Sequence, residues 1–381
     1  MSRQKTTLKS AIRQIHLILG LASGLVVFVV AIAAAILSFE EEGRELFQHD
    51  FYHVKEVSYA RLPFKQMQDS VKAHYPKFKV SSIRFKETKD AAIIFYSKKE
   101  MAVSVDPYTS KINGVLNLKK DFFTVVLSLH THLLLGEVGG TIVKVNVLIF
   151  FIMCVSGLVL WWPKQKRFFK QALTINFKIK NWKRLNWDLH SVLGFYAMLV
   201  LVLVSLTGMF FVYDSVKSTA AFITGNRAPK KEKVKIAQGD KKTFNTDKAY
   251  NYMVSNYPGA IETFITPAAS KTDAIRIQMR YPYTIVRQQN SVYFDPYTGN
   301  IVRADLYKNY NGYDRIAASN YNLHTGRFQL VGIGGKVIYF LTALIAASLP
   351  VTGFMIWLGR RKKKKPLRRH PKRYAKPLPI S

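Results

Sequence analysis

The chain has a single cysteine, Cys154, among its 381 residues. One cysteine cannot form an internal disulfide, and it excludes a cysteine-ligated iron–sulfur cluster and the Cys-x-x-Cys-His attachment of c-type haem. Cys154 lies inside an uncharged stretch. We therefore interpret it as a small buried apolar residue rather than a reactive thiol.

Motifs of nucleotide binding and hydrolysis are also missing. No Gly-x-Gly-x-x-Gly follows a strand-like stretch, which excludes the dinucleotide-binding fingerprint. Neither a Gly-x-Ser-x-Gly nucleophile elbow nor a His-Glu-x-x-His zinc motif occurs. The sequence therefore gives no support for a hydrolase. Because it also has no dinucleotide-binding fingerprint, a redox activity would need electrons from a quinol or a separate cytoplasmic reductase.

Acidic residues are scarce, with 23 Asp and Glu against 57 Lys and Arg, a net charge of +34. The excess is uneven, because residues 1–15, 163–189 and 359–381 hold 23 Lys and Arg but one acid, Asp188. Basic residues in short segments beside apolar runs follow the positive-inside rule of membrane proteins. We therefore expect a lipid bilayer, and no nucleic acid, as the partner of this charge.

Long apolar runs fill much of the remaining chain. Four runs lack any charge: Leu17–Phe39, Val145–Trp162, Ser191–Tyr213 and Val337–Leu358. Each has roughly the 18–25 residues that a helix needs to cross about 30 Å of hydrocarbon. The first is longer than the apolar core of a usual signal peptide, so we expect it to be retained. Small residues that permit close helix approach recur in all four: Gly20, Ser23 and Gly24 in the first, then Ser156-Gly157, Thr207-Gly208 and Thr352-Gly353.

The basic segments predict that both termini and the central loop lie in the cytoplasm and that two domains lie on the opposite side. The predicted order is a cytoplasmic N-terminus (1–15), transmembrane helix 1 (16–39), outer domain 1 (40–121), an interfacial helix with transmembrane helix 2 (122–162), a basic cytoplasmic loop (163–186), transmembrane helix 3 (187–213), outer domain 2 (214–310), an interfacial segment with transmembrane helix 4 (311–358) and a basic cytoplasmic tail (359–381). We expect the tail to set the topology and contact anionic lipid.

The two outer domains share a pattern. Each has a helix-like stretch, 64–76 or 247–258, followed by alternating β-prone residues. Each then has Asp-Pro-Tyr-Thr, at Asp106–Thr109 and Asp295–Thr298, which is typical of a turn that Pro presets and Asp caps. This repetition predicts an internal two-fold repeat, with each α+β domain made of one helix packed on a small antiparallel sheet.

The order of these features resembles the PepSY-associated transmembrane family over nearly the whole chain. The Asp-Pro-Tyr-Thr turns, Leu129-His130-Thr131, the span ending in Trp161-Trp162-Pro163 and the span opening with Trp187-Asp188-Leu189-His190 carry the resemblance. It implies an α-helical bacterial inner-membrane protein with four transmembrane helices and two PepSY-like extracytoplasmic domains. Family members include ferric-siderophore reductases that bind b-type haem through histidines of the membrane domain.

Four histidines occupy matched positions in the two halves. His16 and His190 each open an apolar run, and His130 and His324 each lie in Leu-His-Thr before another. By the predicted topology the first pair lies at the cytoplasmic edge and the second near the outer edge. Ionisable groups at a membrane point to function by default, and imidazole is a common axial ligand of haem iron. We therefore predict two haem b groups, each with two histidine ligands.

The other histidines are less informative. His132 is kept as a substitute for His130, and we expect the helix beside them to break at Gly139-Gly140. His49 and His53 share a helix face and could bind a metal, but a solvated helix beside three glutamates is the simpler interpretation. His74 and His370 are interpreted as surface residues.

Arginines suggest partners for anionic groups. Arg13, Arg184 and Arg327 are candidates for haem propionates. In outer domain 2, Arg280, Arg287 and Tyr281-Pro282-Tyr283 are candidates for binding an anionic or aromatic chelate. The leading hypothesis is a membrane haem oxidoreductase that reduces a ferric siderophore or other ferric chelate. The alternative is a non-enzymatic, membrane-anchored protein that regulates a protease or assists siderophore transport.

Overall fold

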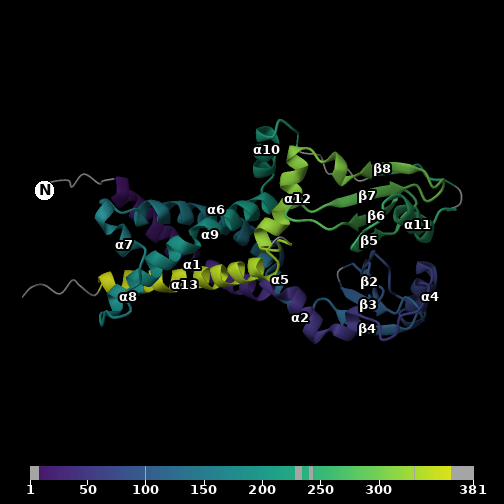
Figure 1. Cartoon of the computed structure of the whole chain (residues 1–381), viewed down its shortest axis with the longest axis horizontal. Coiled ribbons are helices and arrows are strands. Elements are labelled where there is room, and N and C mark those ends of the chain that lie inside the picture. The colour runs from purple at the N-terminus through teal and green to yellow at the C-terminus, as the bar shows by residue number, and fades with distance from the viewer. Residues whose placement is uncertain (1–7, 99, 228–233, 240–242, 330, 362–381) are drawn as a thin grey trace, which may run out of the picture.

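The computed structural model describes residues 8–98, 100–227, 234–239, 243–329 and 331–361. Figure 1 shows an elongated molecule with a bundle of long helices at one end and a β-sheet at the other. Shorter helices lie where the two parts meet. Most of the predicted basic tail, including His370, lies outside the described residues.

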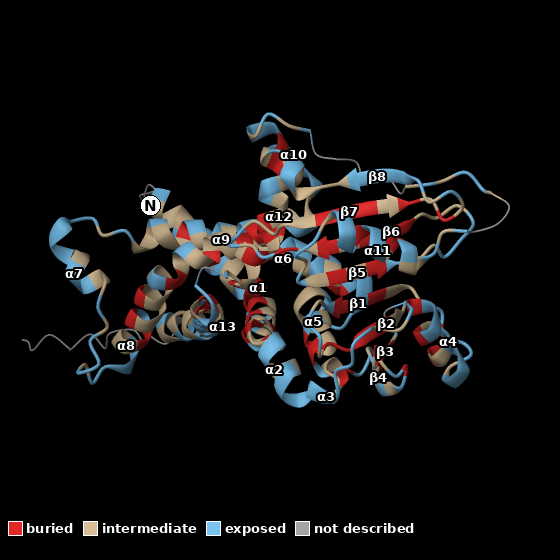
Figure 2. Cartoon of the chain, turned by 45° about the vertical axis from the view of Figure 1, so that its right-hand side comes forward, coloured by how far each residue is buried: buried red, intermediate tan, exposed pale blue. Residues whose placement is uncertain are grey.

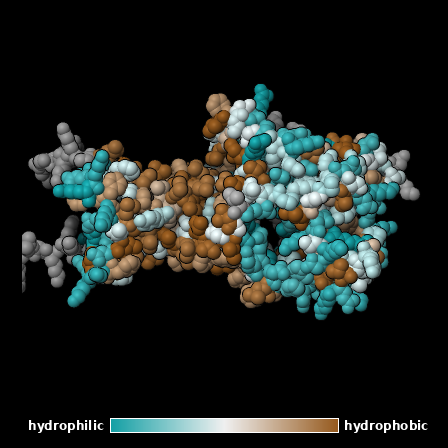
Figure 3. Space-filling view, in the orientation of Figure 1, coloured by the Kyte–Doolittle hydropathy of each residue, from teal (hydrophilic) through white to brown (hydrophobic). Residues whose placement is uncertain are grey.

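Within the described residues, four helical segments are long and apolar enough to cross a membrane. They are α1 (Leu8–Ser38), α6 (Gly136–Trp161), the segment Trp182–Val212 and α13 (Ile333–Arg361). The third comprises α8 (Trp182–Asp188), one π-helical turn η2 (Leu189–Leu193) and α9 (Gly194–Val212). Figure 3 shows the apolar belt that these helices form. The four predicted spans are confirmed, and the chain is a multi-pass membrane protein.

Small residues let the helices of the bundle approach one another closely. Ala31, Ala197, Ala346 and Ala347 share a buried cluster with Leu201. A Cβ placed on Gly24 of α1 would lie 3.3 Å from Cβ of Pro350 in α13. Lipid provides no hydrophobic drive for helix association, so close van der Waals packing of this kind holds such bundles together.

The basic segments gather at one end of the bundle. Figure 1 shows the start of α1, the end of α13 and the segment between α6 and α8 together, at the end opposite the sheet. This segment holds a 3₁₀ turn (η1, Lys166–Phe168) and α7 (Phe169–Ala172), and several of their side chains are exposed. The described residues of these basic segments therefore lie at the end of the bundle away from the sheet.

The eight described strands form one continuous sheet in the order β4-β3-β2-β1-β5-β6-β7-β8. Their bounds are β1 (Ser82–Lys86), β2 (Ile93–Ser97), β3 (Met101–Val105), β4 (Ile112–Asn117), β5 (Glu262–Thr266), β6 (Ile275–Arg280), β7 (Gln289–Phe294) and β8 (Ile301–Asp305). The sequence predicted two separate small sheets, but β1 and β5 pair antiparallel, with Ile83 opposite Ile265. An unpaired strand edge is exposed to aggregation, and this pairing covers one edge of each half, which leaves β4 and β8 as the outer strands.

One hydrophobic core underlies the whole sheet. It is covered by α4 (Phe64–His74) and α11 (Thr246–Asn256), which contribute Met67 and Met253 beside Ile265. Figure 2 shows the buried residues concentrated along the inner strands. The backbone N–H of Phe64 also donates to Asp247 Oδ1 at 2.7 Å, which joins the two helices. The predicted helix-on-sheet packing is therefore present, but the two halves share a single core.

The two Asp-Pro-Tyr-Thr turns have the same geometry. Asp106 Oδ1 accepts from the N–H of Tyr108 at 2.7 Å, and Asp295 Oδ1 accepts from that of Tyr297 at 2.8 Å. Both tyrosine hydroxyls then donate to a backbone carbonyl, that of Lys89 or Lys271. The predicted capping of each turn by its aspartate is confirmed.

Five shorter helices lie between the sheet and the bundle or beside them. They are α2 (Glu40–Phe47), α3 (His49–Tyr52), α5 (Phe122–His132), α10 (Asp214–Ile223) and α12 (Gly312–Thr325). The break between α5 and α6 occurs at Leu133–Leu135, where Leu133 and Leu134 have φ of 51° and 60°. The predicted break at Gly139-Gly140 is wrong, because both glycines lie inside α6. A side chain on Gly139 would overlap the carbonyl of His132, so this glycine serves close packing instead.

A buried ion pair fixes α2 to α5. Arg44 Nη2 lies 2.8 Å from Oδ2 of Asp121, whose side chain is 1% exposed and caps the N-terminus of α5. Burial alone would raise the pKa of Asp121, but hydrogen bonds from Arg44, Gln48 and Thr124 lower it to about 2. The ionised carboxylate is thus part of the contact that positions α5.

We expect Asp121→Asn to lower the free energy of unfolding by about 3 kcal/mol, because it leaves Arg44 without its buried counter-ion. Thermal unfolding of the solubilised protein at neutral pH measures this. A depressed carboxyl pKa stabilises the fold above the unfolded value of about 3.9 and ceases to do so as pH falls towards about 2. The difference between variant and wild type should shrink over that range. Asp69→Asn, at an exposed position on α4, is the control and should have no effect.

Candidate functional site

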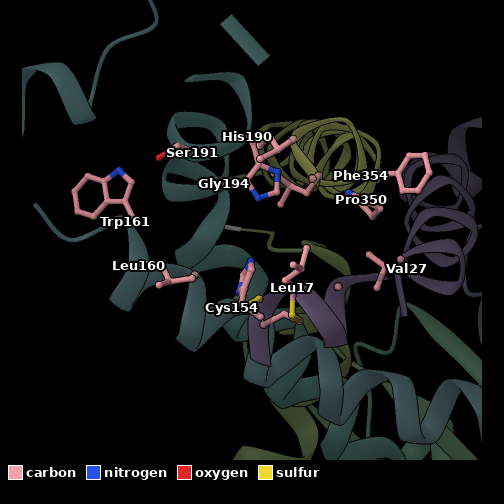
Figure 4. Close-up of a pocket in the computed structure, with 18 of the residues that line it drawn as sticks. Leu17, Val27, Cys154, Leu160, Trp161, His190, Ser191, Gly194, Pro350 and Phe354 are labelled. Atoms are coloured by element: carbon pink, nitrogen blue, oxygen red, sulfur yellow. The ribbon is translucent and has the colours of Figure 1, made fainter. Parts of the chain in front are cut away.

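His16 and His190 line the same cavity within the bundle. His16 lies in the third turn of α1, and His190 lies in the π-helical turn η2, a distortion that is common at functional sites. The cavity, which we call the inner cavity, has a volume of about 420 Å³, within the range of roughly 300–1,000 Å³ of cofactor sites. Figure 4 shows the His190 ring directed into this space, with Leu17 and Cys154 opposite it.

A hydroxyl group orients each inner histidine. His16 Nδ1 lies 2.8 Å from Ser156 Oγ, and His190 Nδ1 lies 2.9 Å from Thr352 Oγ1. Both hydroxyls donate their own proton to a backbone carbonyl of their helix, so their oxygens accept from Nδ1–H. A neutral imidazole protonated at Nδ1 has its lone pair on Nε2. Each inner histidine is therefore oriented so that its Nε2 lone pair is available to bind a metal ion.

Glycines give both rings room. A Cβ on Gly157 would lie 3.5 Å from His16 Cε1, and one on Gly353 would lie 3.3 Å from His190 Cε1. A Cβ at Gly157 would make an ordinary contact with His16, and one at Gly353 would require the His190 ring to shift by a few tenths of an ångström. Both rings thus pack directly against a glycine. Each glycine directly follows the residue whose hydroxyl binds the same histidine, so a Ser/Thr-Gly pair holds each ring.

His130 of α5 and His324 of α12 form the second pair. Their ring centroids are 6.3 Å apart, with an angle of 67° between the ring planes. His130 Nδ1 lies 2.9 Å from the carbonyl of Val30, and His324 Nδ1 lies 3.1 Å from that of Val204. A carbonyl only accepts, so Nδ1 of both rings carries the proton and Nε2 is again free. Burial lowers the pKa of both side chains, which favours the neutral form.

The outer pair repeats part of the inner arrangement. Thr207 Oγ1 lies 3.0 Å from His324 Nδ1, and a Cβ on Gly208 would lie 3.4 Å from His324 Cε1. The carbonyls that bind the outer pair stand 14 residues after His16 in α1 and after His190 in the third span. At a rise of 1.5 Å per residue, the two levels of histidines are about 21 Å apart along these helices.

The structure brings His130, and not His132, to His324. The His132 side chain is exposed, its Nδ1 lies 2.7 Å from the hydroxyl of Thr131, and its ring packs beside Gly140. The two histidines are two residues apart on one helix and therefore face different directions. Among the described residues, the four matched histidines thus form two pairs, with His132 outside both.

Both pairs fit haem b by the chemistry of their donors. A metal midway between two imidazole nitrogens, at about 2 Å from each, places ring centroids roughly 6 Å apart, which matches the outer pair. The inner cavity is lined mainly by apolar side chains, as a porphyrin requires, and it also receives Arg13 and Arg360. These residues fit a non-covalently held iron porphyrin with two axial histidines.

The arginines proposed for propionates have different surroundings. Arg13 lines the inner cavity, whereas Arg184 Nε lies 3.0 Å from the buried carboxylate of Asp188. Arg327 pairs with Glu40 and Glu41 of α2. Of the three, Arg13 is therefore positioned beside the inner histidines, and Arg360 joins it. The sequence analysis did not single out Arg360 as a partner for an anionic group, because Arg360 begins a run of basic residues that was assigned to membrane topology.

The sequence also missed the role of the Ser/Thr-Gly pairs. From the sequence alone, we interpreted Ser156-Gly157, Thr207-Gly208 and Thr352-Gly353 only as sites of close helix approach. The structure shows that the hydroxyl of each pair hydrogen-bonds one histidine and that the glycine gives the ring space. The four spans hold four such pairs, one in each span including Ser23-Gly24, and the rotation of each helix decides which pair faces a histidine.

Arginine and aromatic side chains cover the sheet face opposite α4 and α11. Along β6, Ile277 and Met279 point into the core, and the alternating residues Arg276 and Arg280 point away from it. The Arg280 guanidinium lies 4.3 Å from the Phe264 ring centroid. Arg287 lies 4.3 Å from that of Tyr321 in α12. We call this surface the arginine face.

Tyr281 does not belong to the arginine face. It is 6% exposed, and its hydroxyl donates to the carbonyl of Tyr257 at 2.8 Å. The prediction that Tyr281 contacts a chelate is therefore wrong, because the alternation of β6 directs it to the core side. Arg280 and Arg287, which were predicted with it, do lie on the arginine face.

Comparison with known proteins gives one family. The model of that family, described as the PepSY-associated TM region, matches residues 13–360. No curated protein matches the chain. The matched region includes all four paired histidines, the Ser/Thr-Gly pairs and the whole sheet.

Proposed function

The chain belongs to the PepSY-associated transmembrane family, and from this premise we propose that it is a di-haem b oxidoreductase that passes electrons across the bacterial inner membrane to a ferric chelate. The single observation that carries the proposal is the state of the four paired histidines. Each Nδ1 is bound to an oxygen of another helix, which leaves each Nε2 available. Four histidines in the same state, at two levels of one bundle, are the donor set that two six-coordinate haems need.

Haem b, when bound, would supply one-electron transfer at each level. The chain's own residues hold the two centres and exclude water. Ser156, Thr352 and Thr207 fix three of the rings, as hydrogen-bond partners on the far nitrogen of a metal-bound histidine commonly do. Arg13 and Arg360 line the inner cavity and are our candidates to neutralise the propionates at this level.

Charge supports the proposed sidedness. The described basic segments at the start of α1 and around α7 and α8 lie at the bundle end away from the sheet. The positive-inside rule assigns that end to the cytoplasm. We therefore propose that both termini are cytoplasmic, that the sheet is extracytoplasmic, and that the matched histidines belong to the two halves of an internal repeat.

The arginine face supports an anionic acceptor. Arginines over aromatic rings bind anionic and aromatic groups through charge, hydrogen bonds and stacking. Arg280 binds Glu262 through Nη1, and Arg287 binds Asn322 through Nη2. A guanidinium has five N–H donors, so each of these side chains keeps others for a ligand. A ferric siderophore with carboxylate or catecholate oxygens has this chemistry. Each Fe(III) takes one electron, so one quinol oxidised to quinone would serve two chelates and release two protons.

The reduced-minus-oxidised absorption spectrum of the purified protein tests the proposal. We expect b-type bands and two haems per chain. A haem-free protein from haem-replete cells would overturn the redox function and favour the non-enzymatic alternative.

A further inference from the structure

Three ionisable side chains converge on the arm formed by α2 and α3, away from the paired histidines. They are Glu45, His49 and His53, spaced four residues apart along the chain. One ligand atom from each lies within 4.8 Å of the others. The arm follows α1 directly, so the cluster lies on the sheet side of the membrane belt.

The donor atoms of this cluster face one another. His53 Nε2 lies 2.9 Å from Glu45 Oε1, and His49 Nε2 lies 3.7 Å from the same oxygen. The two imidazole rings stack with centroids 4.4 Å apart and an angle of 13° between planes. Both Nε2 atoms are therefore on the same side, beside one carboxylate.

Asp90 orients His53 from behind. Its Oδ2 lies 2.7 Å from His53 Nδ1, so the proton on Nδ1 is directed to this carboxylate. Backbone contacts hold the two residues together. The N–H of Val54 donates to the carbonyl of Asp90 at 2.8 Å, and His53 forms an isolated antiparallel β-bridge with Ala91. A carboxylate behind a histidine is the usual second partner of metal-bound imidazole.

A neutral His53 held in this way turns its Nε2 lone pair towards Glu45. Two acceptors 2.9 Å apart repel unless a cation lies between them, either a proton or a metal ion. A proton needs only His53 and Glu45. The nearby Nε2 of His49 adds a third donor, and two imidazoles with one carboxylate are a common set for a divalent transition metal.

We propose that Glu45, His49 and His53 bind one divalent first-row transition-metal ion, with Asp90 positioning His53. The side chains of Glu45 and His49 are 46% and 60% exposed, so they can close on an ion at metal–ligand distances of about 2 Å. Their exposure leaves the remaining coordination positions to water. The site is separate from the paired histidines and does not depend on the proposed electron transfer.

The test uses the full-length, untagged, haem-loaded protein after treatment with a chelator. Titration with Zn²⁺ in a calorimeter, and with Co²⁺ followed by its visible absorption, should give one ion per chain. His49→Gln should weaken binding by at least about 100-fold, and Asp90→Asn by about 10–100-fold. His74→Gln, on α4 of the same domain, is the matched control and should bind like the wild type.

His49 is largely exposed, so its replacement leaves the fold intact, and circular dichroism verifies this. Absence of stoichiometric binding to the wild type would overturn the proposal. Equal binding by wild type and His49→Gln would also overturn it, because the ion would then lie elsewhere. The haem spectrum should be the same for all of these proteins, which separates this test from that of the electron-transfer function.

Discussion

Replacement of His190 by glutamine is expected to remove one of two haems and to leave the other. His190 Nε2 faces the inner cavity, and glutamine provides no imidazole nitrogen there. The outer pair, about 21 Å away along the helices, keeps all its contacts. Haem content should therefore fall from two per chain to one, measured by the pyridine haemochrome spectrum. Reduction of an added ferric chelate by quinol should be lost, because electrons could no longer cross both levels.

His132→Gln is the matched control for this variant. His132 is exposed and unpaired with His324, so its replacement should preserve both haems. Added imidazole should restore part of the lost haem to a His190→Gly variant if the defect is ligation alone. Full haem content in His190→Gln would contradict the assignment of His190 as a haem ligand.

His130→Gln is expected to abolish chelate reduction while the inner centre can still be reduced. The variant loses one of the two rings whose centroids are 6.3 Å apart, and the inner cavity is untouched. We expect one haem per chain, rapid reduction of that haem by a quinol analogue, and at least a 100-fold slower reduction of external ferric chelate. Stopped-flow spectroscopy on the solubilised protein measures both rates.

The comparison of His130 with His132 makes this result decisive. Both lie in the last turn of α5, and sequence alone left either as the ligand. If His132→Gln lost the outer haem and His130→Gln retained it, the pairing in the structure would be wrong. If both variants kept two haems, a third residue would have to ligate the outer iron.

Local chemistry explains what the sequence could predict. The four spans were predicted from uncharged runs of sufficient length, and the two turns were predicted from Asp106 and Asp295. Both predictions succeed because these features depend on residues close together in the chain. The four histidines were recognised as a set because they occupy matched motifs in the two halves of the sequence. Whether they bind haem remains a prediction, but their pairing across helices is now a structural fact for the outer two.

Long-range geometry explains what the sequence could not predict. Ile83 and Ile265 are opposite each other in the sheet although 182 positions separate them, and no local pattern selects this partner. The helix break at Leu133 requires a positive φ at a residue that rarely adopts one. The hydroxyl partners of the histidines depend on how each helix is rotated in the bundle, which small-residue spacing does not reveal.

The pairing of β1 with β5 also has a mechanical consequence. A transporter that works by alternating access rocks one half of its membrane domain against the other. Here the two halves are joined outside the membrane by a hydrogen-bonded strand pair and by a core to which both contribute. This seam opposes separation of the two halves on the sheet side of the membrane. We therefore expect it to suit the proposed transfer of electrons better than the passage of an intact chelate through the bundle.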